Sequence, residues 1–321
     1  MTNSLKKTLK IVIPILIGSA LVLYSYLTTT PENREQIWDS IINANLWLVG
    51  LSILIGILSH VSRAIRWNYL LEPLGYRPKL RNNILIIFIS YFANLLVIRS
   101  GEILRVTALD TYENIPFEKG LGTVVTERII DVIMLLFVIF IALLLQTKVI
   151  FEILEKNGIG LAGSIGILIA GILGLLIAIR IIKKSPSPIA VKIKTFLTGL
   201  LDGVLSIFKM KRKIAFIFHT LLIWVCYIGM FWVIKFTVPE TVDLSLGQLL
   251  VAFIAGSFAM VATNGGLGLF PIAVAATLAV FGISENSGEA FGWIMWSSQN
   301  LMLVVFGAIS FLLLPLLNRN R

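Results

Sequence analysis

The 321-residue sequence contains 57% hydrophobic and 14% charged residues, and its mean hydropathy is +0.93. Soluble domains hold about 25% charged residues, so this composition excludes an ordinary soluble protein and indicates an integral membrane protein. The net charge is +10, from 27 basic and 17 acidic residues, and the single cysteine, Cys226, lies in an apolar run. Since the basic residues lie in short loops beside apolar runs, they are expected to set membrane orientation, and no nucleic-acid partner is expected.

Apolar runs recur along the whole chain. They lie at about 9–27, 46–67, 84–98, 129–146, 160–182, 214–236, 248–262, 267–281 and 291–317, with a weaker run at 103–126. A helix needs about 20 apolar residues to cross a hydrocarbon core of about 30 Å. The runs at 84–98 and 267–281 would reach only about 22 Å, so half-helices are expected there.

The basic residues indicate which segments face the cytoplasm, because cytoplasmic loops are enriched in Lys and Arg. The basic segments are 1–10, 61–82, 180–213 and 318–321, whereas acidic residues equal or exceed basic ones in 29–44, 146–160, 235–246 and 282–290. The basic group, which includes both termini, is therefore expected inside, and the other group outside.

Consistent crossing requires the short runs to pair into two hairpins, one entered from each side. The pairs are 84–98 with 103–126, turning at Arg99-Ser100-Gly101-Glu102, and 248–262 with 267–281, turning at Thr263-Asn264-Gly265-Gly266. The sequence therefore predicts an all-α polytopic membrane protein with about six full spans and two broken or re-entrant hairpins, and it leaves open whether the hairpins cross fully.

The hairpins occupy matching positions in two inverted units within a single membrane domain of residues 1–321. Each unit consists of a helix, a hairpin and a helix, and the two units are residues 45–146 and 214–317. The remaining segments are an N-terminal helix with an outer loop at 1–44 and a connector at 147–213. Inverted repeats with interrupted segments point to a transporter with its site between the repeats. The alternative is that two glycine-containing interruptions arise by chance.

Within the connector, apolar residues at helical spacing predict an amphipathic interfacial helix at 189–208.

Two arginines at the inner end of the helix 46–67, Arg63 and Arg66, are candidate headgroup ligands. Their planar guanidinium groups suit a phosphate at the cytoplasmic mouth. Snorkelling membrane anchors would have the same sequence pattern.

The first hairpin carries the polar residues Asn94, Arg99, Glu102 and Arg105, and Glu102 lies three residues from both arginines. A charge deep in a bilayer costs about 2.5–3.5 kcal/mol on insertion scales, so such residues pair or line a wet cavity. These four residues are interpreted as headgroup ligands, with Glu102 positioning the arginines.

Glu127 and Asp131 lie four residues apart at the expected start of the helix 129–146 and share a face. They are interpreted as carboxylates that couple transport to protons or cations. Stabilisation of a helix start by acidic residues is the alternative.

The second turn carries no charge, but Asn264, Gly265 and Gly266 could direct backbone N–H groups at an anionic headgroup. Close glycine packing is the alternative. A polar patch interrupts the last apolar run and is interpreted as a polar pathway, although interhelical hydrogen bonds would account for one or two of its members. It consists of Ser297, Ser298, Gln299 and Asn300.

Motifs for ATP binding, zinc proteolysis and paired-cysteine chemistry are absent from the sequence, whose histidines are His60 and His219. No metal site and no cofactor are expected.

Four motifs in order resemble the flippase-like domain family, the lysylphosphatidylglycerol synthase transmembrane region family of bacterial membrane proteins. They are Ser62-Arg63-Ala64-Ile65-Arg66-Trp67 with Leu70-Leu71-Glu72-Pro73-Leu74-Gly75, Tyr91-Phe92-Ala93-Asn94-Leu95-Leu96 with Arg99-Ser100-Gly101-Glu102-Ile103-Leu104-Arg105, Glu127-Arg128-Ile129-Ile130-Asp131, and Asn264-Gly265-Gly266-Leu267-Gly268. The resemblance spans about 45–315. Many members have a proline where this chain has Val97-Ile98 and charged residues where it has Leu269-Phe270-Pro271, which weakens any transfer of substrate detail.

The resemblance implies a multi-pass protein of the bacterial cytoplasmic membrane. In the best-understood relatives, this domain moves lysylphosphatidylglycerol between leaflets. Those relatives also carry a soluble C-terminal aminoacyl-transferase domain, whereas this chain ends at Arg321 directly after its last apolar run, so no enzymatic activity is expected.

The leading hypothesis is a flippase or scramblase-like transporter of an anionic or aminoacylated phospholipid or a lipid-linked intermediate. Its expected partners are membrane lipids and a separate lipid-modifying enzyme. Two alternatives come from other classes. One is a membrane-embedded enzyme acting on a lipid, with Glu102 and Asp131 as acid and base, and the other is a non-transporting partner of an envelope assembly complex.

Overall fold

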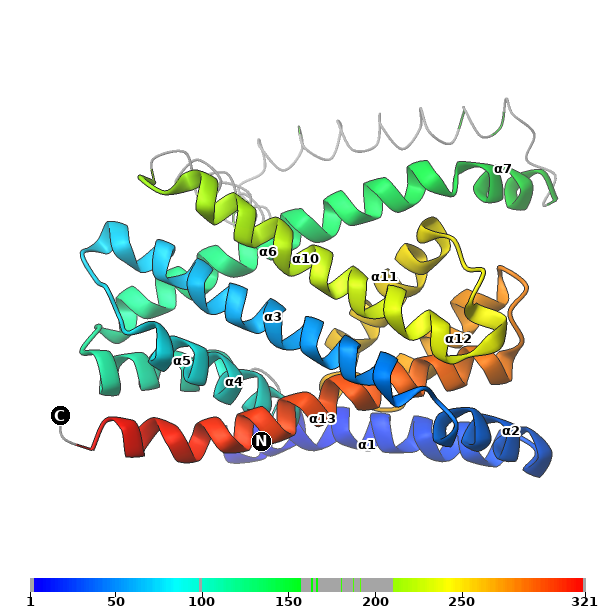
Figure 1. Ribbon diagram of the computed structural model, residues 1–321, viewed down its shortest axis with the longest axis horizontal. Helices are drawn as coiled ribbons and strands as arrows, with labels where there is room; N and C mark the ends of the chain where they lie inside the picture. The colour runs from blue at the N-terminus through cyan, green and yellow to red at the C-terminus, as the bar shows by residue number, and fades with distance from the viewer. Residues whose placement is uncertain are drawn as a thin grey trace. The chain divides into compact units, whose positions relative to one another are not determined.

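The computed structural model describes residues 3–97, 100–156 and 210–319, with isolated positions between 163 and 191, and every regular element in these residues is a helix (Figure 1). Among the described residues, four segments are long and apolar enough to cross a membrane. They are Leu46–Leu74, Phe117–Leu145, Lys213–Thr237 and Glu285–Leu317. The protein is therefore an all-α polytopic membrane protein, as the composition predicts.

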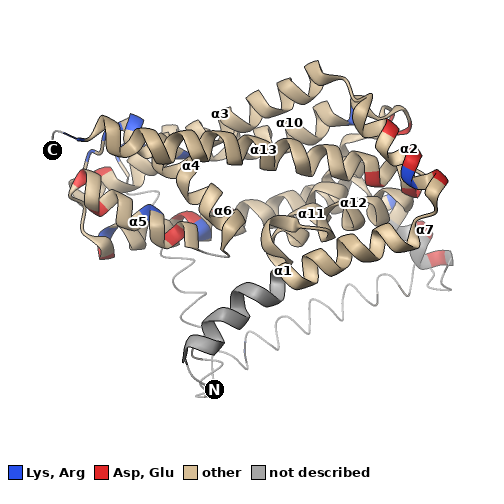
Figure 2. Ribbon diagram, turned by 90° about the horizontal axis from the view of Figure 1, so that it is seen from below, with Lys and Arg blue, Asp and Glu red and all other residues tan. Residues whose placement is uncertain are grey.

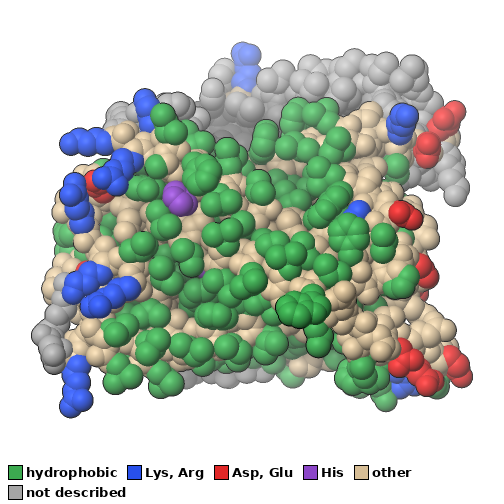
Figure 3. All heavy atoms as spheres, viewed as in Figure 1, with side chains coloured by type: hydrophobic (Ala, Val, Ile, Leu, Met, Phe, Trp, Pro, Cys, Tyr) green, Lys and Arg blue, Asp and Glu red, His purple; other side chains and the backbone are tan. Residues whose placement is uncertain are grey.

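The chain forms two compact units, the first made of residues 1–125 and 211–321 and the second of residues 126–210. In the first unit, charged residues gather at two opposite ends and apolar side chains cover the face between them (Figure 2, Figure 3). The basic end is where α3 (Leu46–Leu71) ends, and the acidic end is where α2 (Pro31–Ile42) lies. Apolar side chains between these ends are widely exposed, as expected for a surface that faces lipid.

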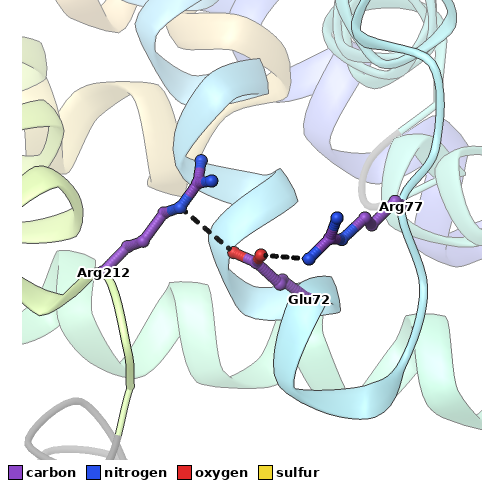
Figure 4. Close-up of polar contacts among 3 residues, drawn as sticks. All are labelled: Glu72, Arg77 and Arg212. Carbon is purple, nitrogen blue, oxygen red and sulfur yellow. Dashed lines mark hydrogen bonds and ion pairs between the residues drawn. The ribbon is translucent and has the colours of Figure 1, made fainter.

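Helix α3 packs along α10 (Lys213–Ile234), which runs in the opposite direction (Figure 1). At the basic end, Glu72 lies between two arginines, 3.1 Å from the Arg77 Nη2 and 3.7 Å from the Arg212 Nε (Figure 4). Both arginine side chains are exposed, at 82% and 62%, so these ion pairs contribute at most about 1 kcal/mol each. They link the end of α3 to the start of α10.

The first hairpin consists of α4 (Leu80–Leu96) and α5 (Ser100–Glu113), which start and finish at the basic end (Figure 1). These helices have 17 and 14 residues, which correspond to about 26 and 21 Å, too short to cross the hydrocarbon core. Asn318, at the end of α13 (Glu285–Leu317), accepts a 3.0 Å hydrogen bond from Asn82 at the start of α4. The hairpin therefore enters from the basic end and turns back inside the unit.

The second hairpin enters from the acidic end and consists of α11 (Leu246–Ala262), the short turn η4 (Asn264–Gly266) and α12 (Leu269–Ala279). A capping box between Ser245 and Gln248 fixes the start of α11. Helix α12 has 11 residues and packs against α13, which runs to the basic end. These boundaries lie within two residues of the sequence prediction, and the two hairpins enter the unit from opposite ends.

The start of α6 (Phe117–Leu145) differs from the sequence prediction. The return leg expected at 103–126 ends at Glu113. Helix α6 begins at Phe117, which is 12 residues before its predicted start at residue 129. Asn114 has a φ of +53°, and Pro116, which cannot continue a helix, follows two residues later. This breaker divides a stretch that appears continuous by hydropathy alone.

At the other end of α6, α7 (Thr147–Lys156) follows directly. The N-terminal segment 1–44 contains α1 (Asn3–Thr28) and α2, and α2 packs against α13. The span expected at 160–182 and the amphipathic helix expected at 189–208 lie outside the described residues, apart from isolated positions.

Glu240, in the turn η3 (Pro239–Thr241), holds the N-terminus of α13 in place. It accepts 2.9 Å hydrogen bonds from the backbone N–H and the hydroxyl of Ser284, the residue that caps α13. These hydrogen bonds lower the pKa of the Glu240 carboxyl below its ordinary value of 4.5, and the bond from the backbone N–H has the larger effect. Because the folded pKa is the lower one, this stabilisation is complete above the ordinary pKa and is lost as the pH falls through the folded value.

We therefore expect Glu240→Gln to be less stable than the wild type at neutral pH, by at most about 1 kcal/mol because the carboxyl is exposed. The difference should disappear at acid pH. Thermal unfolding of both purified proteins at neutral and acid pH measures it, and a constant difference at all pH values would contradict the assignment.

Candidate functional site

Arg63 and Arg66 point from α3 into the interior of the first unit, where 2% and 0% of each residue is exposed. The Arg63 Nη2 donates to the Tyr227 hydroxyl at 3.1 Å and the Arg66 Nη1 to the Thr220 hydroxyl at 3.5 Å, both on α10. The side chains are thus held across the α3–α10 interface. This burial differs from the arrangement of snorkelling anchors, which keep their charge in the interfacial water.

Arg105 brings a third buried guanidinium group from α5, with 1% of the residue exposed. Its guanidinium carbon lies 3.7 Å from the centre of the Trp67 ring, within the range of a cation–π contact. The Trp67 indole N–H donates to the Thr123 hydroxyl at 2.9 Å, which fixes the ring under Arg105. We use the name arginine cluster for the three buried arginines of α3 and α5, which are Arg63, Arg66 and Arg105.

Aromatic and imidazole rings pack around Arg63. The guanidinium carbon of Arg63 lies 5.8 Å from the centre of the Tyr91 ring on α4. The buried His60 packs against Tyr91, with ring centres 4.5 Å apart. Ser62 is within hydrogen-bond distance of the His219 Nδ1, at 2.8 Å, so both histidines are packed among the helices that carry the arginines.

Glu102 lies in the first turn of α5, one turn before Arg105, and is half-buried. Such an acid is stabilised by the positive end of the helix dipole. Arg99, the other arginine predicted for this turn, lies outside the described residues.

The turn of the first hairpin is closed by side chains from both of its helices. The Asn94 Oδ1 accepts from the Gly101 N–H at 2.8 Å, and the Ser100 hydroxyl donates to the Ala93 carbonyl at 2.9 Å. A methyl group at Gly101 would collide with the Ser90 carbonyl oxygen. Asn94 therefore stabilises the turn of the first hairpin, and it is also a candidate ligand of the lipid headgroup.

The turns of the two hairpins meet inside the first unit. The Asn264 Nδ2 donates to the Leu95 carbonyl at 2.6 Å, which satisfies one of the free carbonyl groups at the end of α4. Gly265 approaches the Leu95 side chain, and its own carbonyl accepts from the Trp296 indole N–H of α13 at 2.7 Å. We call this contact between Leu95, Asn264, Gly265 and Trp296 the tip junction.

Glycines give the second turn its conformation, since Gly265, Gly266 and Gly268 have φ values of +61°, +78° and +71°. A Cβ added at Gly266 would lie 2.8 Å from the Met260 sulfur and 3.0 Å from the Phe270 Cβ. Close packing therefore accounts for Gly266. The Oδ1 of Asn264 is buried and has no hydrogen-bond partner among the described residues.

The polar patch of α13 is satisfied largely within its own helix. The Ser298 hydroxyl donates to the Met295 carbonyl at 2.9 Å, and the Asn300 Nδ2 donates to the Trp296 carbonyl at 2.7 Å. Ser297 is exposed and Gln299 is half-buried. Asn300 lies nearest to the tip junction, with its Oδ1 3.8 Å from the position that a Cβ would take at Gly265.

Glu127 and Asp131 lie in the interior of α6, so the interpretation that they open a helix is wrong. Their place follows from the early start of α6 at Phe117. Glu127 is buried, and the Asp131 Oδ2 lies 3.8 Å from the Arg128 Nη1. They belong to the second unit, where they still share a helix face.

Comparison with known proteins adds to this geometry. Residues 11–317 match the family model described as the lysylphosphatidylglycerol synthase TM region. The chain belongs to this family. It is also similar to a UPF0104 membrane protein of Methanocaldococcus jannaschii, at 30% identity over 41% of this chain and 38% of the relative.

A further match is the glycosyltransferase AglD of Haloferax volcanii, at 30% identity over 35% of this chain and 18% of that protein. The alignments thus cover less than half of either relative. No solved structure matches the chain. Membership in the family confirms the resemblance drawn from the four motifs and supports a membrane protein related to lipid handling.

Sequence reasoning missed two groups of residues. Tyr227 and Thr220, which hold Arg63 and Arg66, lie in an apolar run that gave no sign of pairing with α3. Glu289 was assigned to an outer loop, but it is an 8% exposed residue of α13. Its flanking glycines, Gly288 and Gly292, were a usable signal, because both allow α12 to pack closely on this stretch.

Proposed function

We propose that the protein moves an anionic or aminoacylated phospholipid, or a lipid-linked intermediate, between the leaflets of a bacterial cytoplasmic membrane. The observation that carries the proposal is the arginine cluster, buried within a helix bundle whose two hairpins enter from opposite ends. Burying three guanidinium groups is expensive, and in membrane proteins such charges mark substrate pathways. A lipid phosphate matches them, because it accepts bidentate hydrogen bonds from arginine.

The arrangement supports a headgroup path past the tip junction. The arginine cluster lies on helices that extend to the basic end, and the tip junction closes the interior where α4, η4 and α13 meet. Separating Asn264 from Leu95 would break one hydrogen bond between the hairpins, a cost of about 1 kcal/mol that thermal motion can supply. The two hairpins are proposed to act as an alternating gate for the headgroup.

The Lys and Arg bias supports a cytoplasmic basic end, with both termini on that side. Glu127 and Asp131 are proposed to carry protons that couple transport to a pH gradient. No role as a catalyst is proposed, and a separate enzyme is proposed to supply the modified lipid.

Leaflet exchange in proteoliposomes tests the function. Labelled phosphatidylglycerol and aminoacyl-phosphatidylglycerol are reconstituted with the purified wild type or with Glu102→Gln, with and without a pH gradient. Glu102 lies one turn from Arg105 on α5 and is proposed to position the arginines, so we expect exchange by the wild type and at least a tenfold loss in the variant. Wild-type exchange no faster than in empty liposomes would reject lipid transport of these substrates.

A further inference from the structure

A second candidate site lies at the acidic end, away from the arginine cluster. A cavity of about 670 Å³ opens between α1, α2 and α13, and a smaller one of about 290 Å³ shares four of its lining residues. The shared residues are Ser25, Thr29, Ile37 and Glu289. We call the two together the outer cavity. None of its lining residues belongs to the predicted site.

A buried carboxylate forms one wall of the outer cavity. Glu289 is 8% exposed, and the Ser25 hydroxyl donates to its two carboxylate oxygens at 3.3 Å each. Among the described residues, no basic side chain forms an ion pair with it. A carboxylate this deeply buried favours a cationic partner, because burial without compensation is costly.

The remaining charges make the outer cavity acidic overall. Glu35 and Glu285 also line it, whereas Arg34 is the basic residue that the described lining provides. Trp38 and Trp293 add aromatic faces, which attract ammonium groups through their ring electrons. The lining is therefore suited to an ammonium group.

Arg34 provides the complementary feature. Its guanidinium carbon lies 4.2 Å from the centre of the Tyr26 ring, and its Nε is buried with no hydrogen-bond partner among the described residues. Arg34 lines the cavity, and a guanidinium group at this position is suited to a phosphate oxygen. One cavity thus combines a donor for a phosphate with a carboxylate for an ammonium group, the two charges of a zwitterionic headgroup.

The position of the outer cavity favours a lipid as the source of this headgroup. Trp38 and Tyr26 are 61% and 57% exposed, and such side chains gather at membrane interfaces. Apolar Val22 and Ile41 continue the lining and could contact the lipid body. Asp and Glu cluster around α2, which marks this end as the boundary of the apolar surface (Figure 2).

We infer that the outer cavity binds the headgroup of a zwitterionic phospholipid, with its ammonium group at Glu289 and its phosphate at Arg34. Of the lipids proposed for the arginine cluster, an anionic phospholipid lacks this ammonium group, whereas an aminoacylated one carries it. The site also adjoins the second hairpin, because Val22 lines the cavity and packs against Gly268, the residue that caps α12. An occupant would therefore stabilise α1 against that hairpin.

Equilibrium binding to the detergent-solubilised protein tests the inference without any transport measurement. Short-chain phosphatidylethanolamine is titrated while the fluorescence of the tryptophans is followed, since Trp38 and Trp293 line the cavity. Short-chain phosphatidylglycerol, which lacks the ammonium group, and free ethanolamine, which lacks the lipid, are titrated in parallel. The variants are Glu289→Gln, Arg34→Gln and the control Glu32→Gln, an exposed residue of α2 outside the lining.

We expect phosphatidylethanolamine to bind at least tenfold more tightly than either comparison ligand. Affinity should fall at least tenfold in Glu289→Gln and Arg34→Gln and stay unchanged in Glu32→Gln. Equal binding of the two lipids, or wild-type affinity in Glu289→Gln, would overturn the inference. Tight binding of free ethanolamine would contradict the claim that the bound headgroup belongs to a lipid. Glutamine can keep the Ser25 contact, and an unchanged unfolding temperature of Glu289→Gln separates lost binding from misfolding.

Discussion

Replacing Arg105 with alanine is expected to slow leaflet exchange by roughly tenfold to a hundredfold while the protein remains in the membrane. The substitution removes one of the three buried guanidinium groups and its contact with the Trp67 ring. A hydrogen bond to a charged group contributes about 1.5–3 kcal/mol, so the loss of one phosphate contact corresponds to a rate reduction of roughly tenfold to a hundredfold. Exchange of labelled phosphatidylglycerol in proteoliposomes measures this loss.

Two further variants define what Arg105 contributes. Arg105→Lys keeps the charge but loses the planar group that lies on Trp67, so an intermediate rate is expected. Arg77→Ala removes an arginine from the same end whose side chain is 82% exposed, and it should exchange lipid at the wild-type rate. Wild-type exchange by Arg105→Ala would remove Arg105 from the proposed path.

Gly101→Ala is expected to destabilise the protein strongly, because it prevents closure of the first hairpin. An added methyl group would collide with the Ser90 carbonyl oxygen and lie 2.8 Å from the Asn94 side chain, which holds the Gly101 N–H. The helices α4 and α5 would have to separate, at a cost of about 1–3 kcal/mol or more. Thermal unfolding in detergent, followed by size-exclusion chromatography, measures the change.

Gly50→Ala is the matched control for this collision. Gly50 also lies in a helix, but no atom lies within 4 Å of the position that its Cβ would take. Alanine there should be neutral or stabilise by about 0.5–1 kcal/mol, because it restricts the unfolded chain. If Gly101→Ala and Gly50→Ala were equally stable, the close approach of α4 and α5 would be refuted.

Local sequence signals predicted most of the architecture because each acts over a few residues. The second hairpin was located correctly by its short apolar runs and by the turn expected at 263–266, where the structure gives Gly265 and Gly266 positive φ values. The start of α6 was misplaced because hydropathy outweighed Pro116, even though proline and the residue before it disfavour helix. Weighing that breaker would have moved Glu127 and Asp131 into the helix interior.

Contacts between distant segments were not predictable in the same way. The tip junction joins Asn264 to Leu95 across 169 residues, and neither residue carries a local sign of the other. Burial of Arg63 likewise depends on Tyr227 in a helix 164 residues away. Sequence spacing therefore identified the residues at the turns and at the arginine cluster, whereas their partners required the packed structure.

Locking the tip junction tests most directly whether the hairpins form a gate for lipid. Leu95→Cys and Asn264→Cys are combined in a Cys226→Ala background, since Cys226 is the only native cysteine. A short reducible crosslinker then joins the two positions, where the Asn264 Nδ2 lies 2.6 Å from the Leu95 backbone carbonyl oxygen. Each single-cysteine variant, treated in the same way, controls for labelling.

We predict that crosslinking lowers leaflet exchange at least tenfold relative to the untreated double variant, and that reduction restores it. The single-cysteine variants should be unaffected by the reagent. Exchange at the untreated rate by a fully crosslinked protein would contradict the proposed gate, because lipid would then cross without separation of the hairpins.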